Sequence, residues 1–124
     1  MNLDERLVAE GDGESRWTFE DGVLTASPVW DSVLTPDAYG DFRMHVEFAV
    51  NASDDENPEK RGNSGVYIQQ RYEIQILDSY GVGLDEYEPW GCGSLYRLKT
   101  PDQLACRPAE LWQSYDIVFR AARL

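Results

Sequence analysis

The sequence has 124 residues, a formal net charge of -12 at pH 7 and a pI near 4.3. This length fits one domain with a buried core, and the negative charge disfavours nucleic acid and anionic membranes as partners. A neutral ligand such as a carbohydrate meets no such repulsion. No stretch approaches the roughly 18 apolar residues of a membrane span, and residues 1–5 lack the pattern of a signal peptide. As written, the sequence predicts a cytoplasmic protein, or a periplasmic or extracellular one if the true N-terminus lies upstream.

The first quarter of the chain predicts a lead-in followed by a hairpin. We expect residues 1–16 to be loose and residues 17–124 to form the domain. Residues 17–19 and 23–25 are rich in aromatic and β-branched side chains and flank Asp21-Gly22. Because Asp-Gly supplies the positive φ of a tight turn, this segment predicts two short antiparallel strands.

Two further strands are expected before residue 50. Residues 30–34 lie between two prolines and predict a short edge segment, since proline cannot donate to an interior ladder. Residues 41–50 alternate with the two-residue period of a half-buried strand. Its apolar side is formed by Phe42, Met44, Val46 and Phe48. Its polar side carries Arg43, His45 and Glu47.

The insert at residues 51–61 is polar and acidic. Its oxygen-rich side chains are of the type that binds calcium, but they lack the spaced ligands and internal glycine of a calcium loop. A solvated loop is therefore the favoured interpretation.

Residues 62–79 predict the central hairpin. Apolar residues alternate with polar ones on both of its strands. A three-residue loop pairing Ile68 with Ile74 and Gln69 with Glu73 keeps the apolar and polar faces separate. The polar face then carries the candidate site residues Tyr67, Gln69, Glu73 and Gln75.

The remaining chain predicts a long loop and two more strands. Tyr87 and Trp90 lie in the irregular segment 80–91, where they could stack on a sugar ring or fix the loop to the core. A short strand is expected over residues 93–98 and a longer, alternating one over 112–120. Many short strands separated by turns indicate an all-β, antiparallel, two-sheet jelly-roll sandwich.

The two cysteines, Cys92 and Cys106, are compatible with a disulfide, with two free thiols, or with no functional role. They enclose thirteen residues. A disulfide between them would stabilise the fold by roughly 3 kcal/mol in the chain-entropy description.

The chain resembles the 3-keto-disaccharide hydrolase family, whose fold resembles that of concanavalin A-like lectins and glucanases. The resemblance rests on motifs in the family's order: Trp17, Asp21-Gly22, residues 34–42, Asn63-Ser64-Gly65, Tyr72-Glu73-x-Gln75, Asp78 and Trp112. It implies cleavage of 3-keto-glucosides by lyase and hydratase steps or by net hydrolysis. Family members generally continue for several strands beyond the position of Leu124, and many begin with an export signal. The resemblance therefore predicts a sandwich lacking C-terminal strands, with an open edge available for self-association.

The implied chemistry needs a base, an acid and a group that stabilises an enolate, because the ketone at C3 acidifies the hydrogen at C2. The expected catalytic residues are Glu73, His45 and Glu47. The expected substrate-binding residues are Gln75, Tyr67, Gln69, Asp78 and Trp90. These side chains converge if the strand over residues 41–50 neighbours the central hairpin. A divalent metal could serve as the enolate stabiliser, but no spacing demands one, and the cofactor is left open.

Other functions are compatible with the same residues. In a two-carboxylate glycosidase Glu73 and Asp78 would be the acid and base. Their Cα atoms would lie about 16 Å apart along a strand, whereas such carboxyl pairs are about 5–9.5 Å apart. The lectin-like fold also fits a non-catalytic carbohydrate-binding module. A third possibility is an assembly domain that pairs through its open edge.

Overall fold

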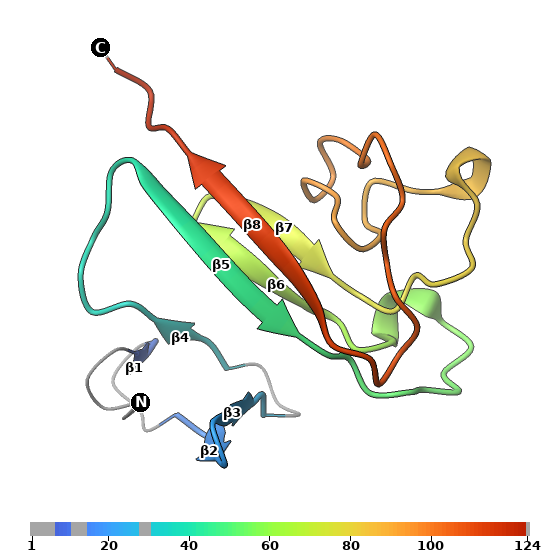
Figure 1. Cartoon of the computed structure of the whole chain (residues 1–124), viewed down its shortest axis with the longest axis horizontal. Coiled ribbons are helices and arrows are strands. Elements are labelled where there is room, and N and C mark those ends of the chain that lie inside the picture. Colours follow the sequence, from blue (N-terminus) through green and yellow to red (C-terminus); the bar gives the residue numbers. More distant parts are fainter. Residues whose placement is uncertain (1–6, 11–14, 28–30, 124) are drawn as a thin grey trace. The chain divides into compact units, whose positions relative to one another are not determined.

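The computed structural model describes residues 7–10, 15–27 and 31–123, and it is all-β and antiparallel apart from two short 3-10 helices (Figure 1). The chain forms two compact units, Met1–Phe42 with Phe119–Leu124, and Arg43–Val118. The expected all-β antiparallel sandwich is confirmed. The part of the chain that the structure describes contains no helix long and apolar enough to cross a membrane.

The smaller unit contains the predicted hairpin. Strand β2 (Thr18–Glu20) pairs with β3 (Val23–Thr25) in antiparallel fashion. Asp21 and Gly22 connect them with φ angles of 51° and 79°. The Asp-Gly turn prediction is therefore confirmed, since both residues adopt the positive φ that such a turn requires.

A second strand pair in this unit joins the first residues described to residues 33–34. Strand β1 (Val8–Ala9) pairs with β4 (Val33–Leu34). The segment 1–16, expected to be loose, thus contributes a short strand. The domain boundary expected between residues 16 and 17 stays a prediction. The strand expected over residues 30–34 is shorter than predicted, and its first residue, Trp30, lies outside the described residues.

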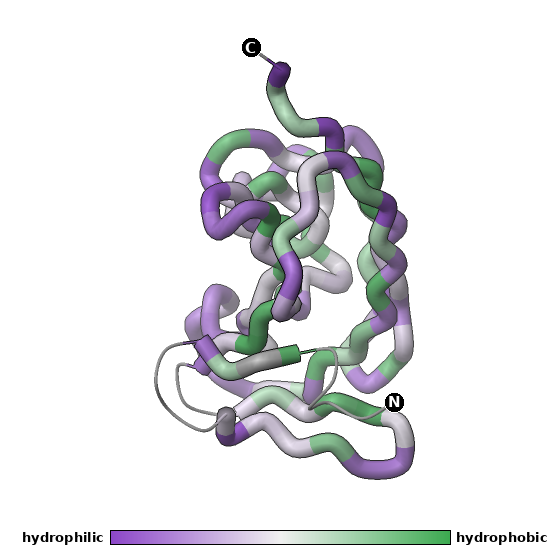
Figure 2. The backbone as a smooth tube through the Cα atoms, turned by 90° about the vertical axis from the view of Figure 1, so that its left-hand side faces the viewer, coloured by the Kyte–Doolittle hydropathy of each residue, from purple (hydrophilic) through white to green (hydrophobic). Residues whose placement is uncertain are grey.

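The larger unit is built on two strand pairs. Strand β5 (Phe42–Phe48) lies beside β8 (Gln113–Phe119), and the two run in opposite directions (Figure 1). Strand β6 (Ser64–Ile68) pairs with β7 (Tyr72–Ile76). Burial alternates along β5 and β8 as the sequence predicts, and the hydropathy of the chain alternates with it (Figure 2).

The core of this unit lies between the two strand pairs. Its buried members are Phe48, Val50, Ile76, Leu77 and Cys92. Partly buried residues packed against it include Val46 on β5, Tyr115 on β8 and Val66 on β6. Each pair therefore turns its apolar side to the other, as in a sandwich. Because side chains alternate along a strand, the polar sides of the two pairs face away from each other.

The β6–β7 hairpin has the three-residue loop that was expected, but its register differs from the prediction by two residues. Ile68 pairs with Tyr72 and Tyr67 with Glu73. The turn begins directly after Ile68, because Gln69 and Gln70 have φ angles of 53° and 54°. A shift of two residues leaves every side chain on its expected face, but it moves Gln69 out of the strand.

The strand expected over residues 93–98 is not formed. The segment makes two isolated bridges, both through Leu95, one with Ile74 and one with Lys99. The chain then reverses at Arg97, whose φ is 60°, and the Leu98 N–H donates to the Leu95 carbonyl at 2.8 Å. A turn at these residues therefore takes the place of the expected strand. In the rest of the segment 77–112 the chain is irregular apart from the 3-10 helix Leu84–Glu86.

The acidic insert at residues 51–61 is an exposed loop that contains the 3-10 helix Pro58–Lys60. Asn57 caps this helix, because its side chain accepts a hydrogen bond from the Glu59 N–H at 3.0 Å. Among the described residues no group of three or more metal-ligating side chains is gathered, in this loop or elsewhere.

Candidate functional site

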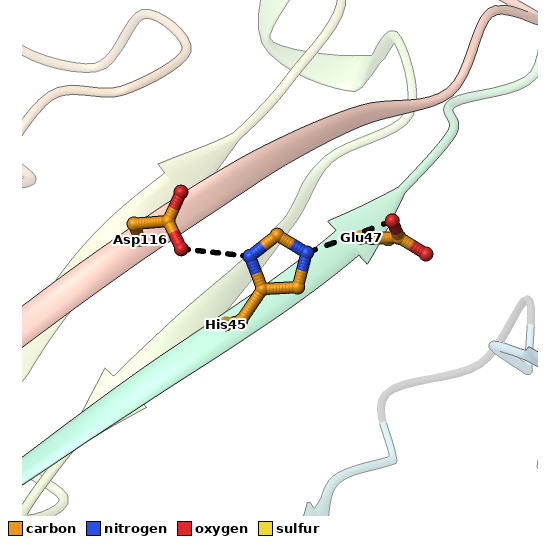
Figure 3. Close-up of polar contacts among 3 residues, drawn as sticks. All are labelled: His45, Glu47 and Asp116. Atoms are coloured by element: carbon orange, nitrogen blue, oxygen red, sulfur yellow. Dashed lines mark hydrogen bonds and ion pairs between the residues drawn. The ribbon is translucent and has the colours of Figure 1, made fainter.

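His45 lies between two carboxylates on the polar side of the β5–β8 pair (Figure 3). Its Nδ1 atom is 2.7 Å from Oδ1 of Asp116, and its Nε2 atom is 3.5 Å from Oε1 of Glu47. Glu47 comes from the same strand as His45, whereas Asp116 comes from β8. The sequence analysis predicted the strand that carries Asp116 but did not select this residue. The contact between His45 and Asp116 is long-range, because 71 positions separate them in the sequence, and no local pattern indicates it.

The two carboxylates raise the pKa of His45 above its ordinary value of 6.5. The hydrogen bond with Asp116 is the larger cause, and that with Glu47 adds to it. The His45 side chain is 53% exposed, so a ligand in solvent can reach the ring. The arrangement can hold, accept or donate a proton near neutral pH.

A cavity of about 480 Å³ opens beside this cluster, within the larger unit. Its lining residues include Glu47, Arg107, Trp112 and Tyr115. Glu47 therefore belongs both to the cavity wall and to the His45 cluster. A hydrogen bond links two residues of the cavity wall, because Arg107 Nη1 donates to the Trp112 carbonyl at 2.8 Å.

Glu73 lies on a different surface. Its Oε2 atom accepts a hydrogen bond from the Tyr67 hydroxyl at 2.9 Å across the β6–β7 hairpin. Both residues are on the polar side of that hairpin, which faces away from the polar side of β5. The structure therefore does not bring Glu73 together with His45 and Glu47. The predicted convergence required β5 to neighbour the hairpin, but β5 pairs with β8.

Residues 6–124 match the family described as the 3-keto-alpha-glucoside-1,2-lyase-like domain. The chain belongs to this family. No curated protein matches it. The chain is similar to a crystal structure described as "a putative glycosyl hydrolase from Parabacteroides distasonis", with 33% sequence identity and a TM-score of 0.76. That match covers 88% of this chain and 45% of the other, so the chain spans less than half of its neighbour's length.

Family membership confirms the resemblance drawn from the motifs. The structure shows the hydrogen bonds and burial of two residues of those motifs, Gln75 and Asp78. Gln75 is only 2% exposed, and its Nε2 donates to the Trp90 carbonyl at 3.1 Å. Asp78 follows β7, is partly buried, and accepts from the Tyr80 N–H at 3.3 Å. Substrate contact by Gln75 stays a prediction that requires the segment around Trp90 to move.

The aromatic residues of the 80–91 loop are fixed to the protein. Tyr87 is 8% exposed, and its hydroxyl donates to the Cys92 carbonyl at 2.7 Å. Burial raises the pKa of Tyr87 to about 12. Trp90 is partly buried and packs against the core. Of the two alternatives for Tyr87, the structure favours the one in which it holds the loop in place.

The other predicted site residues are separated from the His45 cluster. Gln69 is exposed in the hairpin turn, and Tyr67 is 61% exposed beside Glu73. Both cysteines are free thiols, so the disulfide considered from the sequence is not formed in this structure.

Proposed function

We propose that the chain cleaves 3-keto-glucosides or 3-keto-disaccharides by removing the proton at C2, with His45 as the base. The family, whose description is that of a 3-keto-alpha-glucoside-1,2-lyase-like domain, supports this substrate class. The observation that carries the proposal is the 2.7 Å contact between His45 Nδ1 and Asp116 Oδ1. It pairs a titratable group with a carboxylate on an exposed strand face.

The chemistry follows from this contact. A neutral His45 whose Nδ1–H donates to Asp116 presents the lone pair of Nε2 to the substrate. In a 3-keto-glucoside the adjacent ketone acidifies the C2 hydrogen. Removal of that proton forms a C1–C2 double bond as the glycosidic oxygen leaves C1 and takes up a proton from solvent. Water then adds across the double bond to give 3-keto-glucose. As His45 takes the proton it becomes an imidazolium, which Asp116 stabilises through the Nδ1–H bond. Glu47 stabilises the same charge from the Nε2 side.

The cavity beside the cluster supports the binding of a sugar. Its volume of about 480 Å³ is in the range of small-molecule pockets. Trp112 lines it and is 52% exposed, so its ring offers an apolar surface on which a sugar ring can stack. Glu47 in the cavity wall would place the sugar next to His45.

Release of 3-keto-glucose from a 3-keto-glucoside tests the proposal. His45→Ala and Asp116→Asn are compared with Glu73→Gln and with the exposed control Glu56→Gln. A general base contributes about 10²–10⁴-fold, so His45→Ala should lose that factor. The proposed base is wrong if His45→Ala retains wild-type turnover. In that case a large loss in Glu73→Gln would assign the reaction to the β6–β7 face instead. Repeating the assay with a chelator tests the divalent metal that the sequence left open.

The same exposed Trp112 on a cavity also fits a non-catalytic carbohydrate-binding module. Titration calorimetry with plain and 3-keto disaccharides separates the two functions. Binding that Trp112→Ala abolishes, without turnover of the 3-keto sugar, would favour the module.

A further inference from the structure

Cys92 and Cys106 line the same cavity, although they come from different segments of the chain. Cys92 follows the 80–91 loop and is 5% exposed. Cys106 lies in the segment that leads into β8, is half-buried, and packs against the core cluster that contains Cys92. The fold therefore brings two free thiols together beside a space that a small molecule can enter.

The two thiols differ in acidity. A side-chain hydrogen bond from Cys106 is the largest cause lowering the pKa of Cys92 to about 6, against the opposing effect of burial. The Tyr115 hydroxyl, 3.1 Å from the Cys92 sulfur, lowers this pKa further. The hydrogen bond to Cys92 and burial raise the pKa of Cys106. Cys92 is therefore the more acidic thiol of the pair, and the thiolate is the form that attacks disulfides.

We propose that Cys92 and Cys106 form a dithiol modification site that reacts with small disulfides entering the cavity. In the first step the Cys92 thiolate attacks one sulfur of the small disulfide. The S–S bond breaks, a mixed disulfide forms on Cys92, and one small thiolate leaves. In the second step Cys106 loses its proton and attacks the Cys92 sulfur, which releases the second small thiolate. The net reaction converts two protein thiols and one disulfide into a protein disulfide and two small thiols.

The charge of the protein indicates which small disulfides react. A net charge of -12 repels anionic disulfides, whereas an uncharged one approaches without this penalty. The intrachain bond would join the segment that follows β7 to the segment that leads into β8. It would therefore fix the cavity wall on which both thiols lie.

The test treats native protein with bis(2-hydroxyethyl) disulfide, an uncharged probe, and follows intact mass and the peptide map. The wild-type protein should lose the mass of two hydrogens, carry no adduct, and yield a Cys92–Cys106 peptide. Cys106→Ser should instead hold one 2-mercaptoethanol group on Cys92. Cys92→Ser should react more slowly than Cys106→Ser, because burial still raises the pKa of its remaining thiol.

Three results would overturn the proposal. They are an unmodified wild-type protein, stable adducts on both wild-type cysteines, and faster modification of Cys92→Ser than of Cys106→Ser. Circular dichroism of each variant confirms folding before the reaction. Cys106→Ser is the milder substitution because Cys106 is half-buried, so the test keeps a folded variant if Cys92→Ser unfolds.

Discussion

The side chain of Glu73 occupies the space that a side chain on Gly65 would need. A Cβ atom on Gly65 would lie 2.8 Å from Cγ and 2.9 Å from Cδ of Glu73, closer than such atoms approach in proteins. Glu73 is held there by the hydrogen bond from Tyr67. This contact gives a physical reason for glycine in the Asn63-Ser64-Gly65 motif.

Gly65→Ala should therefore displace Glu73 and break its bond to Tyr67. Overpacking of this kind costs about 1–3 kcal/mol of unfolding free energy, measurable by urea denaturation. Gly83→Ala is the matched control, because a Cβ there meets nothing within 4 Å and the backbone φ is -72°. That control should be neutral or stabilised by about 0.4–1 kcal/mol. Equal stabilities for Gly65→Ala and Gly83→Ala would refute the steric account.

The acidity of His45 can be measured without a substrate, because it is the only histidine in the sequence. The ring resonances in an NMR titration should give a pKa above 6.5 in the wild type. Asp116→Asn should lower that pKa, and Glu47→Gln should lower it less, since its contact is longer.

The same pKa sets the pH dependence of activity. The neutral ring is the base, so turnover should rise as the pH rises through the raised pKa, and Asp116→Asn should move this rise to lower pH. An unchanged titration of His45 in Asp116→Asn would contradict the assigned role of the carboxylate.

Tyr87→Phe should destabilise the larger unit without weakening sugar binding. The substitution leaves the Cys92 carbonyl without the hydroxyl that donates to it, at a cost of about 1–3 kcal/mol. Tyr80→Phe is the control, because Tyr80 is 61% exposed and the change should stay within about 0.5 kcal/mol. Thermal melts and calorimetry with a disaccharide give the two readouts. Lost binding with unchanged stability would show that Tyr87 contacts the sugar.

Self-association through an open edge also remains a prediction. The open edge is expected at the C-terminal strand, which the structure forms as β8, and among the described residues β8 pairs with β5 alone in its sheet. Such an edge can pair with a second chain. Light scattering should then show a molar mass that rises with protein concentration. A constant monomer mass over the same range would exclude this association.

Local pattern was sufficient to predict the two longest strands, β5 and β8, but not which strands are neighbours. The alternation in β5 and β8 could be predicted because a two-residue period directly reports a half-buried strand. The contact of His45 with Asp116 could not, since it depends on the pairing of strands far apart in the sequence. Glu73 and His45 are apart for the same reason, because β5 pairs with β8 and not with the hairpin that carries Glu73.

The sequence also did not indicate which strand residues the loops bury. Gln75 lies in a polar position of β7 and was expected to face a ligand. The segment after it folds back instead, so that the Ser94 carbonyl accepts from the Gln75 N–H at 3.0 Å and the side chain is covered. An irregular segment has no periodicity that could reveal this packing.

The most direct test of the proposed reaction is the origin of the hydrogen at C2 of the released 3-keto-glucose. The reaction is run in deuterium oxide and stopped early, with an enzyme-free sample to correct for spontaneous exchange. Proton removal at C2 followed by hydration should place deuterium at C2 with the wild-type protein, and His45→Ala should release little product. Product that keeps its original C2 hydrogen would contradict the account, because the glycosidic bond would then break without C2 deprotonation.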